Sequence, residues 1–376
     1  GLQIFLFILT FAGVKVKLKN LLIMKKAILC LCAMLASGYA VAQSGAKFMQ
    51  GEEGTENKQV SSNGRYLVGE NTNVSNRWGL DNLYGYVSFV QNLETGEKTW
   101  LTSFDETDYG KMGSFTDVSD DGLICGTAKD PDNILTVTEW GETYSLPLNT
   151  AAVWTTDGQV KRLGMGSFSV SDFSNFNDGS FATAISKDGK VVAGYISAGN
   201  YAEVYPVRWT LDEATGEYTY TSYSIPEGCT ESMVNDLSGD GSVAVGYYKV
   251  SGVYYPCYWP TPDEVVPLDN GTLEGRQGCQ AFCISDNGQY IGLTTNRRVP
   301  LMYVIGTNEY RTIGAYEEVR NVEIGGISDK GEAFGIAEHS NGGGVRPFWY
   351  SYAMDTATDF NYFIYRCADN IDAPYN

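Results

Sequence analysis

The sequence predicts an all-β protein, and three observations lead to this prediction. The 376 residues include 43 Gly, 26 Tyr and 16 Phe, a composition that suits strands joined by tight turns. A short pattern recurs six times: an apolar residue, Ser, about two polar residues, Gly, and an alternating apolar run closed by another Gly. An aromatic pattern follows each copy. The turn glycines are 43 to 67 residues apart, a period typical of β-propeller blades.

The N-terminal part of the chain has the three features of an export signal. Met24-Lys25-Lys26 begins a basic segment, Ala27 to Leu35 is apolar, and Ala40-Val41-Ala42 is a small-x-small cleavage site. A membrane anchor is the alternative, but a spanning helix needs about 20 apolar residues. We therefore predict that residues 1–42 are an upstream segment and signal peptide, and that 43–376 form a single β-propeller domain.

Composition limits the partners of the exported part. Removing residues 1–42 removes five Lys and no acid, so the formal charge changes from −19 to −24. Such a surface repels nucleic acid and anionic membranes. We expect neutral or cationic partners, and no membrane span after signal cleavage. Six Cys remain, and we expect most of them to be buried small side chains, with any pairing left open.

The recurring pattern predicts a β-hairpin at each copy. Asp-Gly or Asn-Gly between two apolar runs favours a tight turn, because Gly accepts a positive φ. The Ser hydroxyl can bond to the turn backbone, and the alternating run that follows predicts a strand with one buried face. The six copies begin at Val60, Val118, Ile185, Leu237, Ile284 and Ile327.

Two further strands follow each hairpin. One carries the aromatic pattern, as in Ala152-Val153-Trp154, and the other follows a short polar turn. We expect the aromatic residues in register to be core residues, namely Trp154, Trp209, Trp259 and Trp349. Four antiparallel strands, here A to D, repeated six times predict a six-bladed β-propeller. An open solenoid or a two-domain β-protein is the alternative, and Ala46 to Gln50 is a candidate to close the ring.

These units resemble the HAF-type repeats of bacterial extracellular proteins, in which an I-N/S-x-x-G-x-V-V-G hairpin precedes an A-F-x-W strand. The resemblance covers most of residues 55–366, although the units here vary in length and contain almost no His. It implies a propeller fold and export. It implies little about biochemical function.

Candidate ligand-binding residues lie on the predicted B–C and D–A loops, because function concentrates on such loops. The longest are residues 70–83 and 129–149, followed by D–A loops that carry Asp105 and, later, Phe168, Asp172, Phe173 and Asp178. Aromatic rings there can stack on sugars, or can pack the loops onto the scaffold. The candidates are Arg77, Trp78, Asp105, Asp108, Tyr109, Trp140 and Tyr144.

The sequence contains no recognisable catalytic machinery. Asp105 and Asp108 are candidates for glycoside hydrolysis or for Ca²⁺ binding, but neither spacing is diagnostic and a solvated acidic loop is the favoured explanation. His339 is the single His, so a zinc site with several His ligands is excluded within one chain. Neither a phosphate-binding loop nor a nucleophile elbow is present.

The sequence therefore favours an exported β-propeller, periplasmic, cell-surface or extracellular, that acts as a binding or interaction module for a glycan or a protein. We expect no cofactor other than Ca²⁺ as a candidate. Two alternatives stay open: a propeller enzyme that cleaves glycans with loop carboxylates, and a structural component of an envelope assembly.

Overall fold

The structure is a computed structural model, and its described residues all lie within the compact unit Glu53–Asn376. They consist of strands, turns and one short 3-10 helix, η3, at Val170–Asp172. The described ranges are 55–71, 87–101, 104, 113–139, 141–175, 177–199, 203–268, 279–294, 300–313, 319–339 and 345–359.

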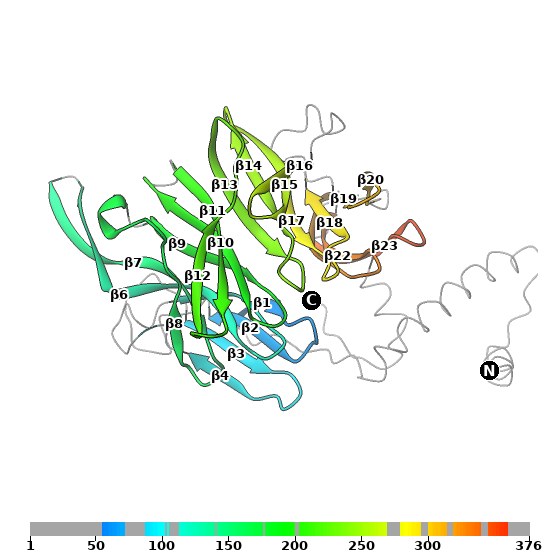
Figure 1. The fold of residues 1–376 in the computed structure, drawn as a ribbon. Coiled ribbons are helices and arrows are strands. Elements are labelled where there is room, and N and C mark those ends of the chain that lie inside the picture. Colours follow the sequence, from blue (N-terminus) through cyan, green and yellow to red (C-terminus); the bar gives the residue numbers. More distant parts are fainter. Residues whose placement is uncertain are drawn as a thin grey trace, which may run out of the picture. The chain divides into compact units, whose positions relative to one another are not determined.

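The described strands form six groups of four, which we call blades 1 to 6 (Figure 1). Blade 1 contains β1 (Thr55–Val60), β2 (Tyr66–Asn71), β3 (Val87–Asn92) and β4 (Lys98–Leu101). Blade 2 contains β5 (Gly113–Val118), β6 (Ile124–Glu139), β7 (Glu142–Trp154) and β8 (Val160–Arg162). Blade 3 contains β9 (Gly179–Ile185), β10 (Val191–Ala198), β11 (Glu203–Asp212) and β12 (Glu217–Ser222).

Blade 4 contains β13 (Cys229–Leu237), β14 (Ala244–Val250), β15 (Val253–Thr261) and β16 (Glu264–Pro267). Blade 5 contains β17 (Gln280–Ile284), β18 (Tyr290–Thr294), β19 (Pro300–Val304) and β20 (Glu309–Thr312). Blade 6 contains β21 (Val319–Ile327), β22 (Glu332–His339), β23 (Val345–Ser351) and β24 (Thr356–Asp359).

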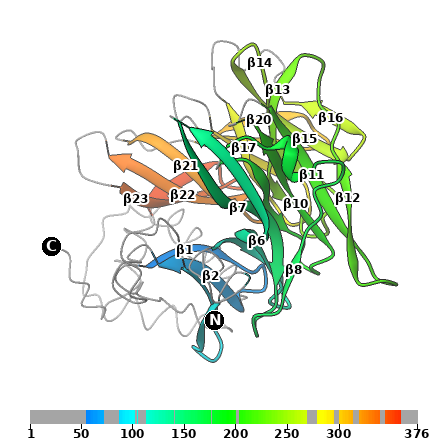
Figure 2. The same cartoon turned by 90° about the vertical axis from the view of Figure 1, so that its left-hand side faces the viewer.

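Each blade pairs its four strands in chain order, all antiparallel. Single parallel bridges, Asn149 with Gly179 and Val204 with Glu231, join blades 2, 3 and 4 at strand ends. Every blade is therefore built from one continuous stretch of chain, as the views in Figures 1 and 2 show by colour. The candidate closing segment, Ala46 to Gln50, lies outside the described residues.

The six A–B turns have the predicted chemistry. Their glycines, from Gly64 to Gly331, all have φ between +69° and +85°. In blade 3 the buried Ser186 hydroxyl donates to Asp188 Oδ1 at 2.8 Å and accepts from the Val191 amide at 2.9 Å. These bonds take the place of hydrogen bonds to water, which a buried hydroxyl cannot form. The repeat is thus explained by the turn that it forms.

In the described part of the chain the core consists of five apolar clusters, each formed between two neighbouring blades. Trp154, Trp209 and Trp259 are fully buried, as predicted. The indole N–H of Trp209 donates to the Gly164 carbonyl at 2.6 Å, which satisfies the polar atom of a buried ring. Because each cluster lies between blades, a single blade cannot bury its own apolar faces, and stacking stabilises all of them.

The prediction for Trp349 is wrong by one residue. Trp349 pairs with the exposed Phe334 and is half-buried, whereas Tyr350 pairs with Ala333 and is buried. The matching pair in blade 4 is Trp259 with Ala244. Tyr350 therefore fills the position that Trp holds in blades 2 to 4, because strand pairing decides which face a residue takes.

The predicted loop 129–149 is also corrected. It is a regular extension of β6 and β7, and both figures show these strands as a long ribbon. Leu135 and Val137 are buried on one face of the ribbon, whereas Ile134 and Tyr144 are exposed. The alternation of apolar and polar residues in Ile134 to Thr138 is the signal of a strand.

Five of the six cysteines of the exported part lie in the described residues. Four of them are buried, as expected: Cys125, Cys257, Cys279 and Cys283.

Candidate functional site

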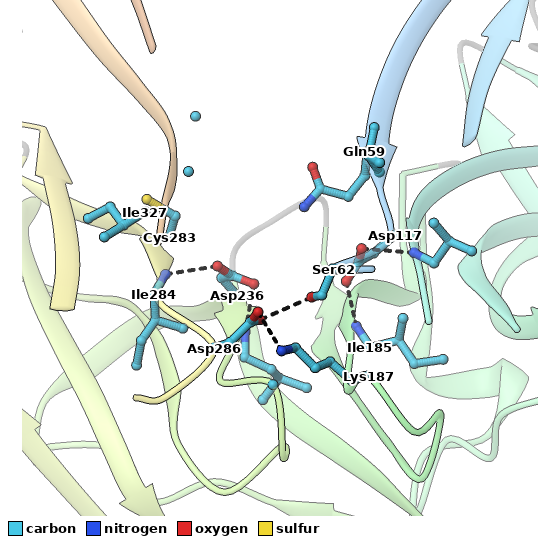
Figure 3. A pocket seen from close by; sticks show the side chains of 16 residues that line it. Gln59, Ser62, Asp117, Ile185, Lys187, Asp236, Cys283, Ile284, Asp286 and Ile327 are labelled. Carbon is cyan, nitrogen blue, oxygen red and sulfur yellow. Dashed lines mark hydrogen bonds and ion pairs between the residues drawn. The ribbon is translucent and has the colours of Figure 1, made fainter. Parts of the chain in front are cut away.

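A polar cavity of about 180 Å³ lies where the first strands of all six blades meet. It is lined by the ends of these strands and by the turns that follow them, and Figure 3 shows its side chains. We call it the axial cavity. Its polar and small lining residues include Gln59, Ser62, Asp117, Lys187, Asp236, Gly239, Cys283, Asp286, Gly325 and Gly326.

A β-bulge in every blade directs residues into this cavity. The pairing of the first two strands slips by one residue, three positions before the turn serine. A bulge changes the alternation of faces, so in five blades the residue two positions before the serine lines the cavity. In blade 3 this residue is Ala184, which packs in the apolar cluster with blade 4. The bulged residues are Lys58, Thr116, Thr183, Asn235, Phe282 and Gly325.

Three of the bulged side chains bind the next blade. Thr116 donates to the Ala182 carbonyl at 2.9 Å, and Thr183 donates to the Val234 carbonyl at 2.8 Å. The Asn235 amide nitrogen donates to the carbonyl of Ala281 in blade 5 at 2.7 Å. These bonds satisfy carbonyls beside the cavity and fix the positions of blades 2 to 5 relative to one another.

Asp117 and Asp236 occupy equivalent places in blades 2 and 4. Asp117 accepts the Val118 amide at 2.8 Å and, with its other oxygen, the Ile185 amide of blade 3 at 2.9 Å. Asp236 likewise accepts the amide of the next residue, Leu237, at 2.8 Å and the Ile284 amide of blade 5 at 2.8 Å. Both carboxyl groups are deep in the protein but keep part of their surface open to the cavity.

Burial is the main influence on the protonation of this pair. It raises the pKa of Asp117 to about 7 and that of Asp236 to about 8, from 3.8. The amides that each carboxyl accepts oppose this shift, while repulsion from Asp117 and Asp286 adds to it at Asp236.

The floor of the cavity holds an ion pair. Lys187 Nζ lies 2.6 Å from Asp286 Oδ2, and the Ser62 hydroxyl donates to Asp286 Oδ1 at 3.0 Å (Figure 3). Gly239 makes room for this lysine, since a Cβ there would contact the Lys187 side chain. Asp286 is therefore already neutralised, and it links blades 1, 3 and 5.

Blade 6 contributes no side chains to the cavity wall at two positions. At the places of Asn235 and Asp236 it has Gly325 and Gly326. Neither glycine has a positive φ, and a Cβ on Gly326 would have no neighbour within 4 Å. The backbone therefore does not require glycine here, and the absence of side chains enlarges the cavity.

Most of the predicted ligand residues cannot be compared with this cavity. Arg77, Trp78, Asp105, Asp108, Tyr109 and Trp140 lie outside the described residues. Tyr144 is 47% exposed on β7, pairs with Val137 and does not line the axial cavity. The prediction that these residues bind a ligand is thus still a prediction.

Acids on the other predicted loops have structural partners. Asp130 makes a two-point ion pair with Arg162, with both N···O distances at 2.8 Å, and so holds the bulge in the β6–β7 ribbon. Asp178 is buried and accepts the amides of Ser174 and Asn175. These contacts explain both acids without a ligand.

The cavity residues were not among the sequence candidates, although a signal for them exists. The turn serine is the same in all six copies, but the position two residues earlier varies. It holds Gln59, Asp117, Ala184, Asp236, Cys283 and Gly326. A carboxylate in a run of buried residues, as at Asp117 and Asp236, is unusual for a strand that only packs. Comparing the copies position by position would have identified this site.

No group of three or more His, Cys, Asp or Glu side chains in the described residues could hold a metal ion. No helix in the described part of the chain is long and apolar enough to cross a membrane.

Comparisons with known proteins concern the fold. No family model matches the sequence, and no curated protein matches it either. A puromycin hydrolase has a TM-score of 0.51 at 12% identity, covering 83% of this chain and 46% of that chain. The β-propeller domain of the Trilobed protease from Pyrococcus furiosus has a TM-score of 0.47 at 10% identity, covering 82% and 84%.

A third solved structure is the periplasmic gluconolactonase PpgL from Pseudomonas aeruginosa. Its TM-score is 0.44 at 14% identity, and the match covers 83% of this chain and 85% of that one. The chain is an all-β protein with a β-propeller fold. The propeller spans less than half of the puromycin hydrolase chain, and at these identities the likeness shows the fold alone. The six described blades agree with the sequence, while the total blade count is still a prediction.

Proposed function

We propose that this β-propeller is an exported binding module of the HAF-repeat type, and that it holds a small ligand in the axial cavity. The signal-like segment before residue 43 supports export. The cavity carries the proposal of binding, because its wall combines charged, polar and glycine positions that differ from blade to blade. A concave site with a small number of convergent polar groups is typical of small-molecule binding.

A catalytic role for the cavity is not favoured. In both Asp117 and Asp236, one carboxyl oxygen already accepts an amide of its own strand and the other accepts an amide of the next blade. Among the described lining residues, Lys187 is the only cationic side chain, and Asp286 engages it. A carboxylate tied to the scaffold in this way is a poor nucleophile, so we propose binding without turnover.

A second surface for a glycan or protein partner stays in the proposal. The β6–β7 ribbon presents Tyr144 to solvent, and Trp140 lies between β6 and β7 in the sequence. Exposed aromatic rings stack on sugars at low entropic cost. Trp78→Ala, Trp140→Ala and Tyr144→Ala should each weaken glycan-array signals without changing the melting temperature. Unchanged signals in all three variants would remove this surface.

The cavity proposal is tested by a thermal-shift screen of small metabolites against the purified protein. A ligand should raise the melting temperature, since binding to the folded state alone stabilises it. Gly326→Leu should abolish the rise by filling the cavity, because the site accepts a Cβ without a backbone clash. Gly164→Leu is the matched control, since Gly164 also has no neighbour within 4 Å but lies outside the cavity. Equal shifts in both variants would contradict the proposal.

A further inference from the structure

The axial cavity contains two deep carboxyl groups for which the described residues supply no cation. Neither Asp117 nor Asp236 forms an ion pair with any described Lys or Arg. Buried charges in proteins are normally paired, since an isolated one costs several kcal/mol in desolvation. Burial keeps both groups partly protonated near neutral pH, and a positive partner, which the described residues do not provide, would allow them to ionise.

The backbone bonds of this pair do not remove that need. Each oxygen accepts one neutral amide, at 2.8 to 2.9 Å. A carboxylate has about four lone-pair positions, so each group retains acceptor capacity on its exposed side. Amides hold the two carboxyl groups in place, but no described cation would balance the charge that each carries when it ionises. The two carboxyl groups, held by these amides, thus form a preorganised site for a cation.

The rest of the charge around the cavity is also negative. Lys187 is occupied by Asp286, and Asp120 and Asp329 lie close enough to favour its charged form. Burial lowers the pKa of Lys187, but these three acids outweigh burial and raise it overall. A cationic ligand would therefore enter a favourable potential.

The shape of the site selects among cations. A single metal ion is disfavoured, because no three metal-binding side chains in the described residues come together. Figure 3 shows Asp117 and Asp236 on two sides of the cavity, with Asp286 and Ser62 between them. About 180 Å³ is enough for a small organic molecule, and the bare wall at Gly326 adds room. A ligand with a positive group at each end matches this arrangement.

Building on the proposed binding role, we propose that the axial cavity binds a small aliphatic diammonium ion, with one ammonium group at Asp117 and the other at Asp236. The raised pKa of both carboxyl groups supports this assignment, because an adjacent ammonium would stabilise their charged forms. Binding should thus release protons near neutral pH.

The test is calorimetric titration of the full protein with butane-1,4-diamine at about pH 7.5 and physiological salt, where surface charges are screened. Measurements in two buffers of different protonation enthalpy report the protons released. We expect saturable binding with net proton release, and weaker binding of butylamine, which has one charge. CaCl₂ should not displace the diamine.

Variants locate the site. Asp117→Asn and Asp236→Asn should each weaken diamine binding about tenfold or more, the usual worth of a charge-assisted hydrogen bond. Asp263→Asn is the matched control, because Asp263 is exposed in the turn between β15 and β16. Gly326→Leu blocks the cavity without touching either carboxyl group, and so tests the site even if an Asn variant folds poorly.

Three results would overturn the inference: no saturable binding, equal affinity for butylamine, or full affinity in Gly326→Leu. The proposed function fails differently. A neutral or anionic metabolite whose thermal shift is lost in Gly326→Leu would confirm a ligand cavity and refute the diammonium assignment.

Discussion

At the scale of single residues, buried polar atoms decide how each turn is built. Ser186 is fully buried, and its hydroxyl both accepts and donates within the turn. The equivalent Ser238 accepts from Val243 and donates to Asp240 in the same way. One hydroxyl thus replaces two contacts with water, which is why Ser stands at this position in every copy.

Ser186→Ala should lower the free energy of unfolding by about 1–3 kcal/mol, because it leaves the buried Val191 amide without an acceptor. Urea denaturation measures this change. Ser145→Ala, which removes an exposed hydroxyl on β7, should cost less than about 0.5 kcal/mol. Equal effects of the two substitutions would refute the role assigned to the turn serine.

Asp236 should make stability depend on pH. Its pKa is about 8 in the folded protein and 3.8 as an ordinary value, so between these limits the folded state binds more protons. The contribution is complete below about pH 4 and is lost as the pH rises through about 8. Wild type should therefore lose more stability than Asp236→Asn between pH 5 and pH 8.

We expect this difference to be about 1–2 kcal/mol, which is less than the full shift implies, since cavity water screens the charge. Urea titrations of both proteins at the two pH values give the comparison. Asp263→Asn should keep the wild-type pH dependence. Parallel losses in wild type and Asp236→Asn would show that Asp236 ionises freely.

At the scale of elements, the second glycine of the repeat in blades 2, 3 and 4 is explained by the bulge. Gly246 on β14 faces the bulge of β13, and a Cβ there would overlap the Met233 carbonyl oxygen. The same holds for Gly194 opposite Phe181 in blade 3. Glycine is needed for close approach of two strands here, since neither residue has a positive φ.

Gly246→Ala should destabilise the protein by about 1–3 kcal/mol, because a rigid carbonyl cannot move aside as a side chain does. Gly164→Ala is the control and should be nearly neutral, as nothing lies within 4 Å of its Cβ position. Thermal and urea unfolding give both values. A neutral Gly246→Ala would mean that β13 relaxes and that the bulge is not fixed by this glycine.

At the scale of the whole molecule, stacking between blades works against a large negative charge. Five inter-blade clusters supply the apolar core. The formal charge of −19, or −24 without residues 1–42, makes the compact state repel itself. Most ion pairs, such as Lys190 with Glu213, are exposed and contribute little.

The melting temperature should therefore rise by a few degrees between about 10 mM and about 0.3 M NaCl, as screening shortens the range of repulsion. Differential scanning calorimetry measures the shift, and KCl should act equally if screening is the cause. A fall in melting temperature would show instead that surface ion pairs outweigh the repulsion.

The sequence by itself determined the all-β class, the repeated four-stranded unit and the turn chemistry. Each of these depends on contacts between neighbours in the chain, as in the hairpin from Ile185 to Gly194. Local periodicity and turn residues encode such contacts directly. The same locality let the sequence identify Trp154, Trp209 and Trp259 as core, while the shift from Trp349 to Tyr350 required the pairing of β22 with β23.

Only the tertiary structure revealed the axial cavity. Its wall combines residues from Gln59 to Ile327, brought together by six bulges that each reverse the alternation of faces. A shift of one residue moves a side chain from one face of a strand to the other, and no short-range pattern records it. Asp117 and Asp236 therefore looked like parts of two packed strands, whereas in the structure both line one shared cavity.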